Sequence, residues 1–321
     1  AASDVYKRQV GYFALDANTT GDENVAVGHE ALKSNTTGQE NTALGQSALV
    51  TNTTGSYNVA VGQDALFTNN ADNNTAIGVN ALYYNSTGSG NVAVGALTLD
   101  AATTATNNTA IGYNGGSEIT TGSENTILGS SALDALTTGG NNTALGYRAL
   151  TLATTSSNNT AVGKDSLLLN TTGTRNTAVG ALAADASATA NDVTAIGYQA
   201  LTANTDSGSN NTAVGSYALS NNTTGSENTA MGKAALGDST TGAYLTAVGS
   251  GAMAAAVTGT KNDAFGYGAG ASITTGSSNT CLATQSGDSI TTGNYNVAKG
   301  VAALQVINTG SNNTAIGYRA A

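Results

Sequence analysis

Apolar and small residues recur along the chain in a five-residue pattern whose most frequent form is N-T-A-V-G. The pattern begins at eighteen places, 17 residues apart except for one unit of 16 (from Asn58) and one of 18 (from Val193). The consensus unit is N-T-A-V-G-x-x-A-L-x-x-N-T-T-G-S-E, numbered here as positions 1–17. Seventeen residues are too few for a helical hairpin, so this period predicts a solenoid in which each unit is one β-coil.

The pentad should be a strand, with positions 2 and 4 on one face and positions 1, 3 and 5 on the other. Position 4 is Val, Ile, Leu, Met or Phe in every unit but one, and β-branched residues suit a strand that faces a core. We therefore expect positions 2 and 4 to point into the coil, as at Val214 and Met231. Leu at position 9 should form the opposite wall, and N-T-T-G-S-E the closing turn.

Three units support one shared cavity for positions 9 and 12. Each has glycine in place of Leu at position 9 and isoleucine in place of the usual Asn at position 12. Such compensation is expected where both side chains fill one volume. The pairs are Gly116 with Ile119, Gly270 with Ile273, and Gly287 with Ile290.

Stacked coils should place identical residues in ladders. Asn at position 1 predicts a ladder of amides bonded to the coils on either side. Gly at position 5, absent only at Ala283, indicates a bend or close approach that a Cβ would obstruct. The ladder is predicted at Asn108, Asn125, Asn142, Asn159 and Asn176.

Position 3 is alanine in all units but two and points away from the expected core. A small residue could simply fit an exposed strand, but a continuous smooth stripe favours contact with neighbouring rods. A coil with so few apolar side chains would also gain stability from association. The predicted oligomer interface comprises Ala178, Ala195, Ala213, Ala230 and Ala247.

The N-T-A-V-G pentad followed three residues later by A-L resembles the head repeats of trimeric autotransporter adhesins, whose units carry an N-S-V-A-I-G-like motif. It is also similar to repeats of phage tail fibres and other surface fibre proteins. The resemblance covers about residues 10–321 and implies a left-handed parallel β-roll that associates as a parallel homotrimer. The longer N-T-T-G-S-E turn departs from the shorter adhesin units.

The amino-acid composition limits the classes of structure and of binding partner. The 40% hydrophobic residues stand at fixed intervals, which argues against a disordered low-complexity chain. A net charge of −10 with ten basic residues argues against nucleic acid, and no apolar run reaches a membrane span. The sequence shows no signal peptide, and a single cysteine excludes an internal disulfide framework.

The sequence offers few residues suited to catalysis, and we predict no enzyme activity, cofactor or metal site. His29, the only histidine, stands at a variable position, and Cys281 replaces a position-3 alanine. One acid per coil supplies too few ligands for calcium. We interpret the acids before the pentads as a solvated edge: Glu23, Glu40, Glu124 and Glu227.

Threonine columns suggest ice binding as a further alternative. That function needs outward threonines separated by one residue, whereas Thr223 and Thr224 are adjacent. N-x-T sequons such as Asn222–Thr224 permit glycosylation on an exported chain. Two residues break the expected core pattern: Lys299 at position 4 and Asp263 at position 2.

Residues 1–9 fit no part of the pattern, and we interpret them as a remnant outside a single array over 10–321 that is cut at both ends. The function predicted is a structural segment of an extracellular fibre, such as an adhesin-like surface filament, with a phage tail fibre shaft as the alternative. The predicted partner is a further copy of the chain, side by side or end to end. The predicted location is the outside of a cell or virion.

Overall fold

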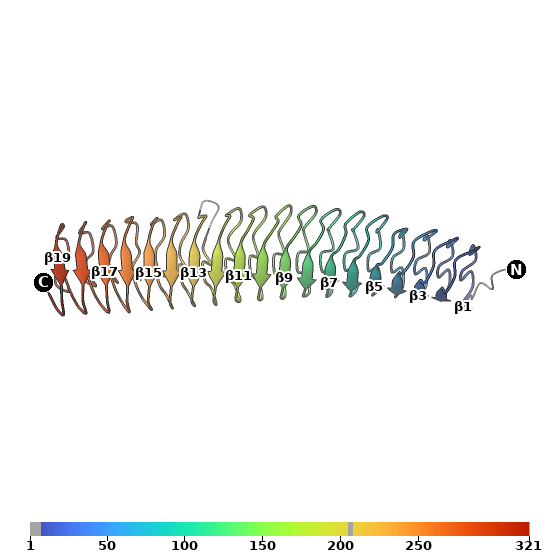
Figure 1. Ribbon diagram of the computed structural model, residues 1–321, viewed down its shortest axis with the longest axis horizontal. Coiled ribbons are helices and arrows are strands. Elements are labelled where there is room, and N and C mark those ends of the chain that lie inside the picture. Colours follow the sequence, from blue (N-terminus) through green and yellow to red (C-terminus); the bar gives the residue numbers. More distant parts are fainter. Residues whose placement is uncertain (1–7, 205–207, 321) are drawn as a thin grey trace. The chain divides into compact units, whose positions relative to one another are not determined.

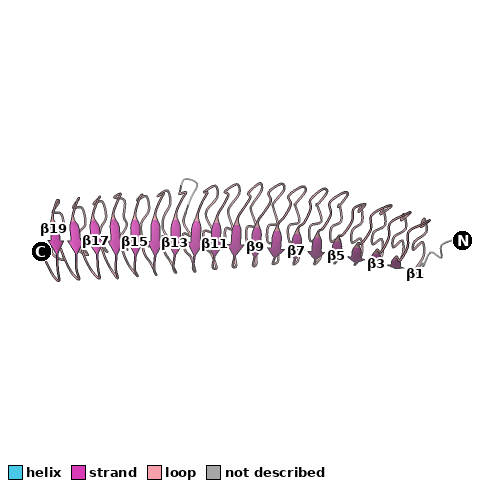
Figure 2. Ribbon diagram, in the orientation of Figure 1, coloured by secondary structure: helices cyan, strands magenta, loops and turns pink. Residues whose placement is uncertain are grey.

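The computed structural model describes residues 8–204 and 208–320 and divides into two compact units, 1–158 and 159–321. The described residues of both units form three-residue strands joined by turns and bends, without a helix (Figures 1 and 2). The first unit contains β1 (Arg8–Val10), β2 (Val25–Val27), β3 (Thr42–Leu44), β4 (Val59–Val61), β5 (Thr75–Ile77), β6 (Val92–Val94), β7 (Thr109–Ile111), β8 (Thr126–Leu128) and β9 (Thr143–Leu145). The second contains β10 (Thr160–Val162), β11 (Thr177–Val179), β12 (Thr194–Ile196), β13 (Thr212–Val214), β14 (Thr229–Met231), β15 (Thr246–Val248), β16 (Asp263–Phe265), β17 (Thr280–Leu282), β18 (Val297–Lys299) and β19 (Thr314–Ile316).

Within each unit, every strand pairs in parallel with the next strand in sequence. β13 and β14 show the register: Ala213 lies beside Ala230, and Val214 beside Met231. Equal positions of successive coils therefore stack at the interstrand distance of about 4.8 Å. The prediction of an all-β, parallel β-solenoid with about 17 residues per coil is confirmed.

β1 starts inside the segment that fits no repeat. Arg8 pairs with Val25 and Gln9 with Ala26, in the register of the later strands. The predicted remnant therefore shares its last two residues with the first strand, and its residues 1–7 lie outside the described residues.

The face of the strand that points inward is opposite to the one we predicted. Ala213 and Ala230 are fully buried, whereas Met231 is 45% exposed and Val214 half-buried. The prediction that Val214 and Met231 face the interior was therefore wrong. The cause is the asparagine at position 1, whose amide is hydrogen-bonded inside the coil. Alternation along the strand then turns position 3 inward and positions 2 and 4 outward.

This reversal also removes the two apparent violations of the core. Lys299 and Asp263 occupy positions 4 and 2, which point outward, and both residues are exposed. Neither coil has to rearrange to accommodate a charge.

The opposite wall follows the prediction. Leu219 at position 9 and Ala218 at position 8 are fully buried, as are most of their equivalents along both units. Where glycine replaces the leucine, isoleucine occupies its space. A Cβ added at Gly116 would lie 2.8 Å from Cδ1 of Ile119, and one at Gly270 would lie 2.9 Å from Cδ1 of Ile273. The predicted cavity shared by positions 9 and 12 is confirmed.

Each coil bends through several residues with a left-handed backbone. At position 5, Gly215 has φ +137°, and a Cβ there would lie 2.5 Å from the carbonyl oxygen of Gly232. This close approach of successive coils explains the near-invariant glycine, and Ala283, the exception, has φ 119°. Position 9 is left-handed although it is usually leucine, as at Leu219 with φ 50°. That conformation costs about 1–2 kcal/mol, which burial of the side chain, about 1.5–3 kcal/mol, offsets.

The 16-residue coil has a local replacement for its missing residue. Asn70 accepts hydrogen bonds at its Oδ1 from the backbone N–H groups of Thr53 and Thr54, both at 3.0 Å. In the preceding coil, the N–H groups of Thr36 and Thr37 donate to the backbone carbonyl of Thr53 instead. A side-chain carbonyl thus takes the place of a backbone carbonyl, so the turn closes with one residue fewer.

Candidate functional site

A ladder of buried asparagines at position 1 joins the coils internally. Asn108 donates from Nδ2 to Oδ1 of Asn91 at 3.3 Å and to the carbonyl of Gly122 at 2.9 Å. Asn125 and Asn142 continue the ladder through bonds of 3.0 and 3.1 Å. In the second unit, the backbone N–H of Asn176 donates to Oδ1 of Asn159 at 2.9 Å, and both Nδ2 groups bond across their own coils. Each amide therefore binds the adjacent coil and closes its own, which satisfies buried polar groups.

A second buried ladder, which the sequence analysis did not identify, lies at position 12. Asn35, Asn52 and Asn69 each donate from Nδ2 to Oδ1 of the preceding asparagine, at 2.9, 3.0 and 3.3 Å. The ladder ends where alanine follows at Ala102, which leaves Oδ1 of Asn85 buried and without a partner among the described residues. The isoleucines found at position 12 in other coils were the available signal that this position faces inward.

The predicted alanine interface is corrected. All five alanines are fully buried inside their own coils, so no neighbouring molecule can contact their side chains. Where leucine forms the opposite wall, a methyl group fits between the wall and the strand. Ile127, a larger residue at position 3, is buried beside Gly116. The five alanines are Ala178, Ala195, Ala213, Ala230 and Ala247.

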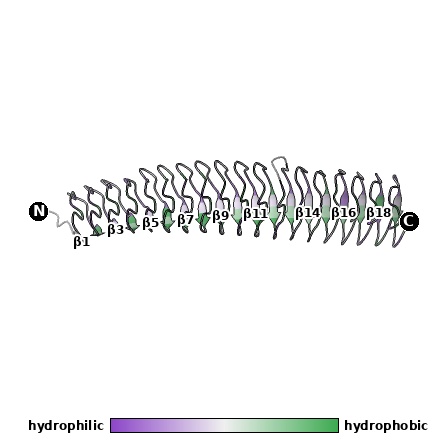
Figure 3. Ribbon diagram, turned by 180° about the vertical axis from the view of Figure 1, so that it is seen from behind, coloured by the Kyte–Doolittle hydropathy of each residue, from purple (hydrophilic) through white to green (hydrophobic). Residues whose placement is uncertain are grey.

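The exposed side of the strands carries aliphatic residues instead. We call the side chains at positions 2 and 4 the strand face; in both units position 2 is mostly Thr and position 4 mostly aliphatic. Figure 3 shows hydrophobic residues recurring at these strands. An apolar stripe that recurs in register marks a surface for association rather than scattered surface residues. The exposed large hydrophobic residues of the strand face are Val10, Leu44, Ile77, Ile111 and Leu128 in the first unit and Val179, Ile196, Met231, Phe265 and Ile316 in the second.

Charge is absent from most of the strand face. No ionisable side chain occupies positions 2 or 4 in β2–β9 of the first unit or in β10–β15 of the second. The charged residues of this face are Arg8 in β1, Asp263 in β16 and Lys299 in β18. The uncharged stretches are the parts of the face on which water is displaced most easily.

The side chains considered for catalysis are not assembled into a site. His29 is half-exposed and lies 4.0 Å from Glu30. Within residues 8–204 and 208–320, no three His, Cys, Asp or Glu side chains are placed to hold a metal ion. The same ranges contain no helix long and apolar enough to cross a membrane. The position-17 acids are exposed, as expected of a solvated edge: Glu23, Glu40, Glu124 and Glu227.

Cys281 is predicted to resist alkylation in the folded protein. Its side chain is fully buried at position 3, and burial, followed by the charge of Asp288, raises the thiol pKa to about 12. At pH 8 only about one thiol in ten thousand is then the reactive thiolate. Iodoacetamide at pH 8 should leave Cys281 of the native chain unmodified and should modify it fully in about 6 M guanidinium. Mass spectrometry measures the modified fraction. Rapid modification of the native chain would contradict this burial.

The turn threonines also bond between coils. Thr36 donates from Oγ1 to the carbonyl of Thr53 at 2.9 Å, and Thr137 does the same to Thr154. Position 13 is thus engaged internally, while position 14 is exposed. The outward threonines with a regular spacing are those at position 2 of the strand face, not the adjacent pair in the turn.

The stacked coils, the two internal asparagine ladders and the exposed strand face define a parallel β-solenoid repeat protein. Comparison with protein-family models and with curated proteins gives no match to this chain.

Proposed function

We propose that the chain is a structural segment of an extracellular fibre, an adhesin-like surface filament, and that it associates with further copies of itself through the strand face. The observation that carries the proposal is the stripe of exposed aliphatic and threonine side chains in register along each unit, which is uncharged over β2–β9 and β10–β15.

A second copy of this chain fits the strand face better than an unrelated partner. The apolar groups repeat once per coil, at about 4.8 Å. A parallel copy offers the same groups at the same spacing, so that each position 4 meets a position 4 at equal height. Cyclic symmetry about an axis along the strand stack of a unit produces this arrangement for all coils of that unit.

The resemblance to adhesin head repeats supports three copies and a left-handed coil. Within such a trimer, Asp263 and Lys299 would each place three like charges at one height. The contact is therefore interrupted at β16 and β18 and strongest over the uncharged strands. The threonine at position 2 can pack its methyl group in such an interface while its hydroxyl group donates a hydrogen bond.

The proposal is tested by measuring the mass of the assembly in solution. Sedimentation equilibrium of the full chain should give three times 31.4 kDa. Because charge would be placed in the apolar contact, the double variant Val214→Glu/Met231→Glu should sediment as a smaller species. The matched control Thr224→Glu/Thr241→Glu adds the same charge to exposed turn positions of the same coils and should keep the assembly. A monomeric wild type, or unchanged mass of the first variant, would refute the proposal.

Ice binding is the second candidate function. On the strand face, the threonine at position 2 and the aliphatic residue at position 4 both point outward from the same strand. Position 2 is threonine in all strands from β10 to β15. A flat array of this kind on a single chain would be open to ice, whereas association would cover it. Thermal hysteresis that is present in the wild type and lost in Val214→Glu/Met231→Glu would favour ice binding. A trimer without hysteresis would exclude it.

A further inference from the structure

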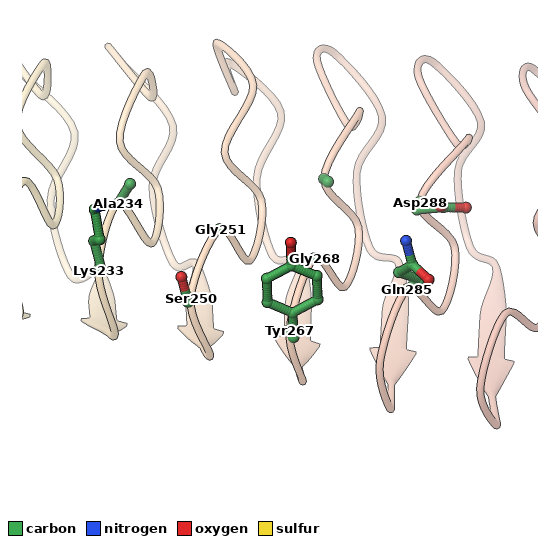
Figure 4. Close-up of a pocket in the computed structure, with 9 residues that line it drawn as sticks. Lys233, Ala234, Ser250, Gly251, Tyr267, Gly268, Gln285 and Asp288 are labelled. Atoms are coloured by element: carbon green, nitrogen blue, oxygen red, sulfur yellow. The ribbon is translucent and has the colours of Figure 1, made fainter.

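A trough of about 360 Å³ lies beside the strands of the second unit, on the turn segment at positions 6, 7 and 10. Its floor is formed by Ala234, Gly251 and Gly268, which occupy position 7 in three successive coils. In Figure 4, Tyr267 stands in the middle, with Lys233 towards one end and Asp288 towards the other. This volume is within the range of about 300–1,000 Å³ typical of ligand pockets.

The two glycines that open the trough are not required by packing. A Cβ at Gly251 would meet no atom within 4 Å, and one at Gly268 would meet only Cγ of Gln285, at 3.6 Å. Their left-handed backbone, φ +65° and +61°, is the one that larger residues adopt at position 7 elsewhere, such as Gln199 and Tyr217. The small residues therefore leave space where other coils carry a long side chain.

The polar groups around the trough are available to a ligand. In the described part of the chain, no hydrogen bond or ion pair engages the side chains of Lys233, Gln285 or Asp288. Oδ1 of Asp288 is buried without a partner there and is closed to a ligand, so only the other carboxylate oxygen, Oδ2, can accept from one. Tyr267 is 62% exposed, with its ring at the centre of the trough.

We propose that this trough binds a short saccharide that bears a carboxylate. The C–H face of a sugar ring packs on the Tyr267 ring, whose face carries partial negative charge. Hydroxyl groups donate to Asp288 and exchange hydrogen bonds with the amide of Gln285. The ammonium of Lys233, three coils or roughly 14 Å from Gln285, binds the carboxylate. The charge of Asp288 disfavours the reverse orientation.

The probes are a disaccharide of glucuronate and N-acetylglucosamine and the neutral N,N′-diacetylchitobiose, each titrated into the full chain and followed by NMR or calorimetry. We expect saturable binding of the acidic disaccharide and weaker binding of the neutral one. Gly251→Gln fills the trough with a side chain, and Tyr267→Ala removes its aromatic ring. Each variant should therefore weaken binding about tenfold or more. The matched control Ser131→Gln places glutamine at position 7 in a coil of the first unit and should change nothing.

Gly251→Gln should fold, since Gln199 and Gln285 hold the same position with φ 52° and 54°, and an unchanged unfolding temperature checks this. Tyr267→Ala alters an exposed ring and provides a second, independent variant. Absence of saturable binding by either disaccharide, or wild-type affinity in both variants, overturns the proposal. Equal affinity for the two disaccharides overturns the carboxylate contact with Lys233.

Discussion

Replacing Ala213 by glutamate is expected to unfold the coils around β13, whereas replacing its neighbour Val214 by glutamate should leave them folded. Ala213 is fully buried between the strand and the opposite wall. A glutamate there overfills the core and buries a carboxylate without a partner, which should cost about 5 kcal/mol or more. At Val214 the new side chain points out of the coil, so the coil itself should lose only about 1 kcal/mol from strand preference, apart from what the loss of association contributes.

The two variants are a matched pair, because they place the same charge on adjacent residues of one strand. Urea unfolding followed by circular dichroism, at one protein concentration for both, gives the difference in free energy of unfolding. The pair Ala230→Glu and Met231→Glu repeats the comparison in the next coil. If Val214→Glu unfolds and Ala213→Glu stays folded, position 4 faces the interior and the orientation described here is wrong.

The period of the sequence is sufficient to predict the coil, because parallel stacking requires equal residues at equal heights. The 17-residue unit, the glycine at position 5 and the leucine wall at position 9 all follow from it. The compensation of Gly116 by Ile119 even indicates which positions share a cavity. These features depend on spacing and volume, and both can be read from one chain.

The orientation of the strand could not be predicted in the same way. A two-residue alternation defines two faces without saying which is inside. Preference for β-branched residues in a core selected the wrong one, since Val and Ile are also suited to an outer strand surface. The decisive observation is that Asn108 and its equivalents bond across the interior. A polar side chain that is fully hydrogen-bonded can occupy a core, and the alternation then places alanine beside it.

The candidate trough could not be predicted from the repeat for a different reason. Positions 6, 7 and 10 vary between coils, so the repeat gives no consensus there. The available signal was the succession Ala234, Gly251 and Gly268 at a position where other coils bear long side chains. Only the structure shows that Tyr267 and Asp288 border the space they leave.

The second large effect is expected from exchanging the contents of the cavity shared by positions 9 and 12. Leu99 and Ala102 are both fully buried and belong to the coil that precedes Gly116 and Ile119. Leu99→Gly should lower the free energy of unfolding by about 3 kcal/mol, since the lost burial and the cavity outweigh the relief of a left-handed leucine. Ala102→Ile alone should cost about 1–3 kcal/mol by overpacking.

The double variant Leu99→Gly/Ala102→Ile should recover about 2 kcal/mol or more relative to the sum of the single changes, because the isoleucine then fills the space of the leucine as in the following coil. Urea unfolding of the four proteins of the cycle measures this coupling. The control Leu49→Gly/Asn52→Ile makes the same exchange inside the position-12 ladder. There Asn52 bonds to Asn35 at 3.0 Å, so the added isoleucine breaks buried hydrogen bonds and no recovery is expected. Equal recovery in both coils would mean that the second ladder contributes little to stability, and additive effects at Leu99 and Ala102 would contradict a shared cavity.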